Sequence, residues 1–316
     1  MAQRALITGI TGQDGSYLAE LLLAKGYEVH GLFRHDENSG RIPADTFAAV
    51  QIHKGLVDNY ADVVKAIQDS RPEECYHLAA QSFVMGEEFT TMRTNSMGTH
   101  HMLAAIREHT QDCRLFLAGS SEMFGDVDHS PQTEATPMHP RNIYGISKLS
   151  GLLLLRHYRE THGIHASCGI LYNHESPRRG EQFVTRKITR AAARIQAGIE
   201  KELRLGNLDA IRDWGDACDY VEAMWLMLQQ PKADDYVIAT GQSRTVRQFL
   251  DAAFAAVGMH WEEFVVVDPQ FYRPAEKHPM TGDASKARRQ LGWAPKRNFE
   301  AMVAEMVKQD TASLRS

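Results

Sequence analysis

Residues 4 to 15 read RALITGITGQDG, and this stretch decides the fold that we expect. The apolar run RALIT ends at Thr8, glycines follow at positions 9, 12 and 15, and a helical pattern continues from Ser16 to Lys25. Glycines in such a turn let the backbone approach a pyrophosphate, and the new helix offers the anion its free N–H groups and positive dipole end. The stretch therefore predicts a dinucleotide site at a strand–turn–helix unit. Its predicted contacts are Gly9, Thr11, Gly12, Gln13, Asp14 and Gly15.

Strands and helices alternate along the first half of the chain. Predicted strands cover residues 28–34, 50–54, 74–80, 114–119 and 165–172, and predicted helices cover residues 60–70, 94–109 and 144–161. This alternation is typical of a parallel, doubly wound sheet. Ligands of such sheets gather at the carboxyl ends of the strands. We expect an α/β protein with a Rossmann-like doubly wound parallel sheet.

A smaller lobe is expected in the second half. Shorter elements follow residue 172, with strands at 204–207 and 236–239 and helices at 185–198, 219–229, 246–257, 284–291 and 299–308. Because no Pro/Ser-rich linker or repeat separates two halves, we predict an interleaved α/β substrate-binding lobe, with the substrate in the cleft between the lobes. The predicted dinucleotide-binding domain is 1–172 plus about 214–240, and the predicted lobe is 173–213 and 241–316.

Composition argues against several classes of protein. Apolar residues make up 43% and charged residues 24%, and a net charge of −5 offers no basic field for nucleic acid. No apolar run approaches the roughly 18 residues of a membrane span, and the N-terminus enters a strand without a signal sequence, so we expect a cytoplasmic protein that binds no membrane. The four cysteines lie far apart without CxxC spacing, so we predict neither a disulfide framework nor a metal site.

The end of the second predicted strand bears on the choice of cofactor. NAD-preferring proteins place a carboxylate there for the ribose hydroxyls, whereas this strand ends in Phe33, Arg34 and His35. Arg34 suits a 2′-phosphate because a guanidinium grips phosphate well. We therefore predict NADP, and Asp36 keeps NAD as the alternative.

Two short clusters lie where substrate chemistry is expected. Residues 118–122 read AGSSE after the fifth strand, and residues 144–148 read YGISK at the start of a helix. Tyr144 and Lys148 are four residues apart, so they share one helix face, where the ammonium can lower the pKa of the phenol. Ser120 and Glu122 are two residues apart and point to the same side of an extended chain. We predict that these four side chains converge on one small molecule.

The motifs TGxxGxxG, Ser120 and YxxxK together resemble the extended short-chain dehydrogenase/reductase family, over nearly the whole chain. More specifically, the segments NHESPRRG (173–180), FVTRKI (183–188), RLGNLDAIRDWG (204–215) and DYVEAMWLMLQ (219–229) are similar to those of the GDP-mannose 4,6-dehydratases. The resemblance implies a hydro-lyase that oxidises a GDP-linked hexose at C4, eliminates water across C5 and C6, and returns the hydride to C6.

The same resemblance implies the role of each site residue. Tyr144 takes the proton of the 4-hydroxyl, Lys148 supports it, Ser120 binds the 4-oxygen, and Glu122 acts as base at C5. The other implied cofactor contacts are Arg34, Leu56, Leu78, Ala79, Ala80, Ser82, His174 and Arg179, beside Tyr144 and Lys148. The implied nucleotide-sugar contacts are Ser82, Ser120, Asn173, Lys187, Arg212, Arg273 and Glu276.

Departures from the family pattern leave alternatives open. Asn142-Ile143 replaces the usual Ser-Pro before the tyrosine, and Gly119 replaces a serine, so the sugar could instead be a GDP-linked manno-heptose. A 4-keto-reductase or epimerase would need Tyr144 and Lys148 but not Glu122. A non-catalytic NADP sensor would not need the Tyr144–Lys148 pair. The resemblance also implies a homodimer through helices 94–109 and 144–161, with a tetramer as the alternative.

Overall fold

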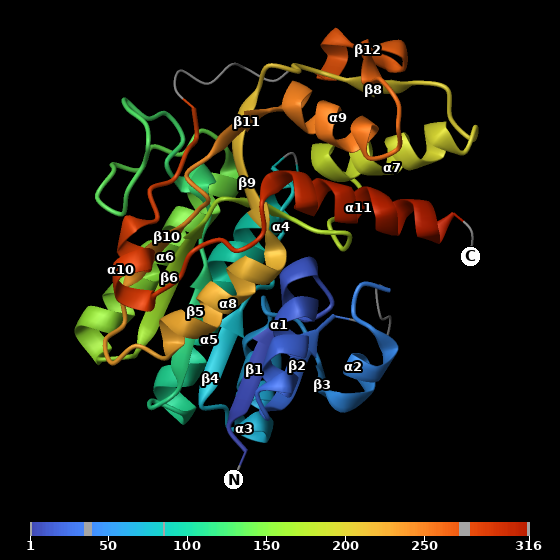
Figure 1. Cartoon of the computed structure of the whole chain (residues 1–316). Helices are drawn as coiled ribbons and strands as arrows, with labels where there is room; N and C mark the ends of the chain where they lie inside the picture. The colour runs from blue at the N-terminus through green and yellow to red at the C-terminus, as the bar shows by residue number, and fades with distance from the viewer. Residues whose placement is uncertain (1, 35–39, 85, 272–278, 315–316) are drawn as a thin grey trace.

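The computed structural model describes residues 2–34, 40–84, 86–271 and 279–314. A seven-stranded sheet forms its centre, in the order β10-β6-β5-β4-β1-β2-β3, and every neighbouring pair is parallel (Figure 1). Its strands are β1 Arg4–Thr8, β2 Glu28–Phe33, β3 Gln51–Lys54, β4 Glu74–His77, β5 Arg114–Ala118, β6 Ala166–Leu171 and β10 Asp235–Ile238. The doubly wound α/β fold predicted from the sequence is confirmed.

Helices cover both faces of this sheet because successive strand residues point to opposite sides. Leu6 packs into one apolar layer, whereas Ala5 and Ile7 pack into the other. The first layer includes helices α3 Tyr60–Ser70, α5 Gly98–His109 and α6 Ile143–His162. The second includes α1 Gln13–Ala24, α8 Ala217–Leu228 and α10 Ser285–Leu291, with α2 Ala44–Ala49 beside α1. Burial on both faces explains why inner strands such as β1 (RALIT) and β5 (RLFLA) are mostly apolar.

A third apolar cluster belongs to a smaller lobe. It is built on α7 Val184–Gln196, α9 Val246–Ala255 and α11 Phe299–Ser313, and Trp214 and Phe249 pack within it. Two small sheets accompany it, β11-β9-β7 (Ser243–Thr245, Ile211–Asp216, Asn173–Glu175) and β12-β8 (Val265–Val267, Leu203–Leu205). Helix α10 packs instead on α8 and β10. The domain boundaries given above stay a prediction.

Several elements differ from the sequence-based expectation. The expected helix 94–109 is preceded by α4 Glu88–Met92 and begins as a π-helical turn, Arg93–Met97, before α5. The sequence does not predict strands β7 and β9, because β7 has only three residues and the two strands pair with each other across a long stretch of sequence. Among the described residues, 3-10 turns lie at Ser121–Met123, Trp261–Glu263 and Pro269–Phe271.

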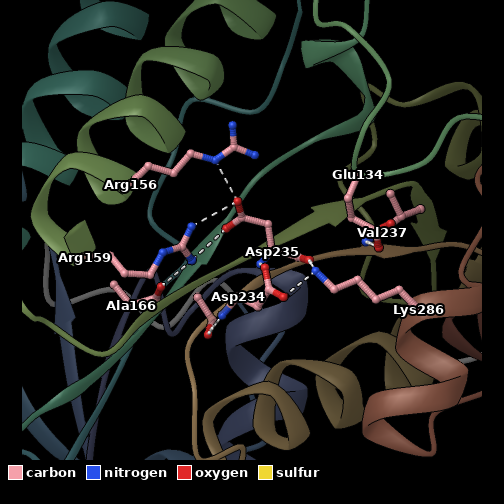
Figure 2. Close-up of polar contacts among 9 residues, drawn as sticks. Glu134, Arg156, Arg159, Ala166, Asp234, Asp235, Val237 and Lys286 are labelled. Carbon is pink, nitrogen blue, oxygen red and sulfur yellow. Dashed lines mark hydrogen bonds and ion pairs between the residues drawn. The ribbon is translucent and has the colours of Figure 1, made fainter.

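An ion cluster fastens helix α6 to the edge of the central sheet (Figure 2). The buried carboxylate of Asp235, on edge strand β10, accepts hydrogen bonds from Arg156 Nε at 2.8 Å and from both terminal nitrogens of Arg159 at 3.1 and 3.2 Å. Glu134 accepts a hydrogen bond from Val237 N at 2.8 Å and so covers the exposed edge of β10. The helix that carries Tyr144 and Lys148 is therefore held at its far end by paired charges.

None of the described helices is long and apolar enough to cross a membrane. All four cysteines are free thiols, and Cys75, Cys113 and Cys168 are buried.

Candidate active site

A cavity of about 860 Å³ lies at the carboxyl ends of β1, β4 and β5. Ser120, Glu122, Tyr144 and Lys148 all line it, as does every residue that we predicted as a cofactor contact. Of the predicted sugar-nucleotide contacts, Ser82, Ser120 and Asn173 also line it, whereas Lys187 and Arg212 do not. Arg273 and Glu276, like Asp36, lie outside the described residues. The roles of all these residues stay predictions.

The glycine-rich turn between β1 and α1 forms one wall of the cavity. Gly9 has a φ of +73°, and a Cβ at this position would lie 2.8 Å from Ala79 N, so the turn requires glycine. No side chain caps the N-terminus of α1. Its first N–H groups are therefore available to an anion, as the sequence predicts.

An ion pair closes the turn against the second lobe. His174 Nε2 lies 2.9 Å from Asp14 Oδ2, and its Nδ1 lies 2.8 Å from the carbonyl oxygen of Tyr172. Both partners are acceptors, so the imidazole donates from both nitrogens and is positively charged. Burial alone lowers the pKa of His174, but the charge of Asp14 and the hydrogen bond to it outweigh burial and raise the pKa. The pKa of Asp14 is lowered, because the charge and hydrogen bond of His174 prevail over its own burial.

The segment after the carboxyl end of β5 and the first turns of α6 position the four predicted catalytic side chains. Ser120 follows β5 and accepts a hydrogen bond from Glu122 N at 3.2 Å. Tyr144 and Lys148 lie one turn apart at the start of α6. The ammonium of Lys148 is 5.8 Å from the centre of the Tyr144 ring and donates to the carbonyl oxygen of Ala118 at 2.8 Å.

Burial changes the acid–base balance expected from the sequence. Burial raises the pKa of Tyr144 to about 12, although the hydrogen bond with Ser120 acts to lower it. Burial also lowers the pKa of Lys148 to about 8. The attraction between ammonium and phenolate that the Tyr144–Lys148 spacing predicts is opposed by the cost of removing both charges from water. The protein groups alone therefore do not lower the pKa of the phenol.

A loop closure brings Glu122 to the start of α6. Gly125 and His139 form an isolated bridge, in which Asp126 N donates to His139 O at 3.1 Å and His139 N donates to Phe124 O at 3.0 Å. The intervening residues loop outward, and the chain then returns to Asn142. There Asn142 Nδ2 donates to Glu122 Oε2 at 2.7 Å, a contact that the sequence analysis did not anticipate.

Asn95, in the π-helical turn, is a second residue that the sequence analysis missed. Its amide pairs with Gln81 N at 2.8 Å and Gln81 O at 3.2 Å, and donates to Ser147 Oγ on α6 at 2.9 Å. It thus ties the segment after β4 to the helix that carries Tyr144. An asparagine within an otherwise helical pattern was the available signal, because asparagine is a weak helix former.

Comparison with known proteins identifies the family. Residues 6–306 match the family model described as GDP-mannose 4,6 dehydratase. The chain belongs to this family. It is 50% identical to GDP-mannose 4,6 dehydratase 2 of Arabidopsis thaliana, over 97% of this chain and 86% of that protein. It is 42% identical to the Vibrio cholerae GDP-mannose 4,6-dehydratase, over 98% of this chain and 94% of that protein.

Solved structures of enzymes with other names show the same fold. The Thermus thermophilus UDP-glucose 4-epimerase, in complex with NAD, gives a TM-score of 0.85 at 25% identity, covering 98% of this chain and 99% of the other. The dTDP-glucose 4,6-dehydratase of Bacillus anthracis, also in complex with NAD, gives 0.84 at 20% identity, covering 97% and 96%. Epimerisation and dehydration thus share this architecture, so the fold alone does not decide the chemistry, which depends on the side chains of the site.

Proposed function

We propose that this protein is a hydro-lyase that converts GDP-mannose to GDP-4-keto-6-deoxymannose. The observation that carries the proposal is the position of Glu122, in the same cavity as Ser120, Tyr144 and Lys148. Membership of the GDP-mannose 4,6 dehydratase family, and the names of relatives at up to 50% identity, support the substrate.

The cavity suits a nicotinamide dinucleotide as cofactor. The uncapped start of α1 and the turn at Gly9 provide N–H groups for a diphosphate, and the lining continues from there to Arg34 on one side and Lys148 on the other. The chemistry that such a cofactor would supply is hydride transfer from C4 of the sugar and back to C6, together with a positive charge that would favour a phenolate at Tyr144.

Tyr144 is the base for the 4-hydroxyl in this proposal. Its burial raises the pKa, so the phenolate needs positive charge nearby at the moment of reaction, and Lys148 supplies part of it. Ser120 is placed to hydrogen-bond the same sugar oxygen, because it interacts with the Tyr144 hydroxyl. The proton of the 4-hydroxyl passes to Tyr144 as the C4–O double bond forms.

Glu122 performs the step that distinguishes a dehydratase. A ketone at C4 acidifies the C5 hydrogen, which the Glu122 carboxylate removes as a proton. Glu122 gives this proton to the 6-hydroxyl, which leaves as water, and a C5–C6 double bond remains. A 4-keto-reductase or epimerase has no use for this carboxylate, and the intact pair Tyr144–Lys148 argues against a non-catalytic sensor.

Mannose is the proposed hexose, with a manno-heptose as the competing substrate. A Cβ at Gly119 would lie 2.8 Å from Cys168 Sγ and 3.0 Å from Met123 Cε, so a side chain there would enter the interior and not the sugar pocket. The glycine at position 119 therefore gives no support to a larger sugar. Of the two departures from the family pattern near the sugar pocket, only Asn142-Ile143 still supports one.

We expect wild-type protein to convert GDP-mannose to the 4-keto-6-deoxy product, faster than the GDP-linked heptose, without net consumption of cofactor. Chromatography with mass spectrometry measures both products, and absence of dehydration would refute the proposal.

NADP is the proposed form of the cofactor, because Arg34, which follows the end of β2, and a second arginine, Arg41, both line the cavity. Replacing Arg34 with alanine should weaken NADP binding by roughly 10- to 100-fold, as expected for loss of a charge-assisted phosphate contact, and change NAD binding little. Calorimetry with both dinucleotides measures this, and NAD serves as the internal control. An equal loss for both dinucleotides would contradict the assignment to the 2′-phosphate.

Two of the residues proposed to contact the GDP moiety, Lys187 and Arg212, do not line the cavity. Lys187 is exposed on α7, with its ammonium 5.9 Å from the centre of the Phe271 ring, and Arg212 lies on β9. Substrate bound to them would extend from the cavity into the smaller lobe.

A homodimer through α5 and α6 is the proposed assembly. Exposed apolar side chains on α6 and in the π-helical turn before α5 support it: Ile146 and Leu153 on α6 are 43% and 56% exposed, and Met97 in the turn is 46% exposed. Light scattering should give the mass of two chains, and a monomer would contradict the proposal.

A further inference from the structure

Asn142 uses both ends of its side-chain amide, and the two contacts lie on different segments of the site. Its Oδ1 accepts a hydrogen bond from Gly145 N at 2.8 Å and so caps helix α6. Its Nδ2 donates to Glu122 Oε2 at 2.7 Å. Because a backbone N–H only donates and a carboxylate only accepts, these partners allow one orientation of the amide.

We propose that Asn142 is a positioning residue, which holds the Glu122 carboxylate for removal of the sugar C5 proton. The inference rests on the proposed dehydratase function and assigns a role within it. Oε2 of Glu122 is occupied by Asn142, whereas Oε1 accepts no hydrogen bond from any residue that the structure describes. Oε1 is therefore the oxygen that takes the proton.

An amide suits this task better than the other common donors. It donates to the carboxylate but does not give up a proton at physiological pH, so it favours the anion without competing with the sugar. A lysine or arginine in its place would neutralise the carboxylate and weaken it as a base. The hydrogen bond also restricts a side chain that would otherwise sample several rotamers while half-buried.

The cap that Asn142 forms on helix α6 also links it to the first step of the reaction, the oxidation at C4 in which Tyr144 is the base. Asn142 stands two residues before Tyr144, and its cap fixes the start of the helix on which Tyr144 lies. The base for the 4-hydroxyl and the base for C5 are thus located by one side chain. Loss of the Nδ2 donor alone should therefore affect elimination without disturbing Tyr144.

The substitution Asn142→Asp separates the two contacts. Aspartate caps a helix as well as asparagine does, so α6 keeps its start, but it has no N–H to donate and places a second carboxylate beside Glu122. After rapid mixing with GDP-mannose, we expect reduced cofactor to form at the wild-type rate, measured by its near-ultraviolet absorbance. Its decay, and exchange of the C5 hydrogen with solvent deuterium, should slow on the order of 10- to 100-fold, with KM nearly unchanged.

A matched control is available at Asn298. It caps α11 by accepting from Ala301 N at 2.8 Å, the same three-residue spacing, and it does not line the cavity. Asn298→Asp changes the charge equally and should leave every rate at the wild-type value. Both variants should unfold at the wild-type temperature, whereas Asn142→Ala, which loses the cap as well, should unfold lower and eliminate as slowly as Asn142→Asp.

The possible results are distinct. Decay at the wild-type rate in Asn142→Asp would overturn the positioning role and leave the dehydratase function standing. Equal slowing of formation and decay would also overturn it, because that pattern means general disruption of the site. Failure of the wild-type protein to dehydrate GDP-mannose would overturn the proposed function, and this inference with it.

Discussion

Replacement of Glu122 by glutamine is expected to abolish dehydration while sugar oxidation continues. Glutamine has nearly the same shape, and its carbonyl oxygen can still accept from Asn142, but it cannot take a proton from C5. Loss of a general base typically costs a factor of about 10² to 10⁴ in rate. Rapid mixing with GDP-mannose should show reduced cofactor accumulating, with little 4-keto-6-deoxy product in single-turnover samples.

Glu134 provides the control for this experiment. It lies on the same connection between β5 and α6 and accepts its hydrogen bond from Val237 N, and it does not line the cavity. Glu134→Gln keeps that acceptor, so it should turn over at the wild-type rate. Full dehydratase turnover by Glu122→Gln would show that another group removes the C5 proton.

Gly125→Ala is expected to cause the largest loss of stability. The backbone at Gly125 has a φ of +57°, and an added Cβ would overlap the carbonyl oxygen of His139. Backbone strain and overlap each cost on the order of 1–3 kcal/mol, so the free energy of unfolding should fall by about 3 kcal/mol or more. Denaturant titration followed by circular dichroism measures the change.

Gly163→Ala separates these two contributions. Gly163 ends helix α6 with a φ of +68°, and no atom lies within 4 Å of the place its Cβ would take. This variant carries the strain alone and should lose only about 1 kcal/mol. If Gly125→Ala is no more damaging than Gly163→Ala, the close crossing at His139 does not constrain the fold.

Local patterns account for what the sequence predicted well. Strand β1 and helix α3 have the predicted bounds, because an apolar run and an amphipathic helix between caps are readable from neighbouring residues. Ser120, Glu122 and Tyr144 reach one cavity because the ends of parallel strands share an edge of the sheet.

Contacts between distant segments account for what the sequence did not predict. Strand β7 exists only through its pairing with β9, and Asn142 reaches Glu122 only because the chain crosses itself at Gly125. The pKa of Tyr144 depends on burial by many residues, which no motif encodes. These features require the assembled fold.

The bridge between Gly125 and His139 also offers a permissive place for engineering. Asp128, His129 and Ser130 are exposed beyond the bridge, whereas Gln132 is buried and bonded to Thr281 and Asp283. Residues inserted between positions 128 and 130 would extend into solvent, and lengthening a loop that is already closed costs little entropy. A peptide tag or fluorophore could be carried there while the base of the loop keeps Glu122 and Asn142 together.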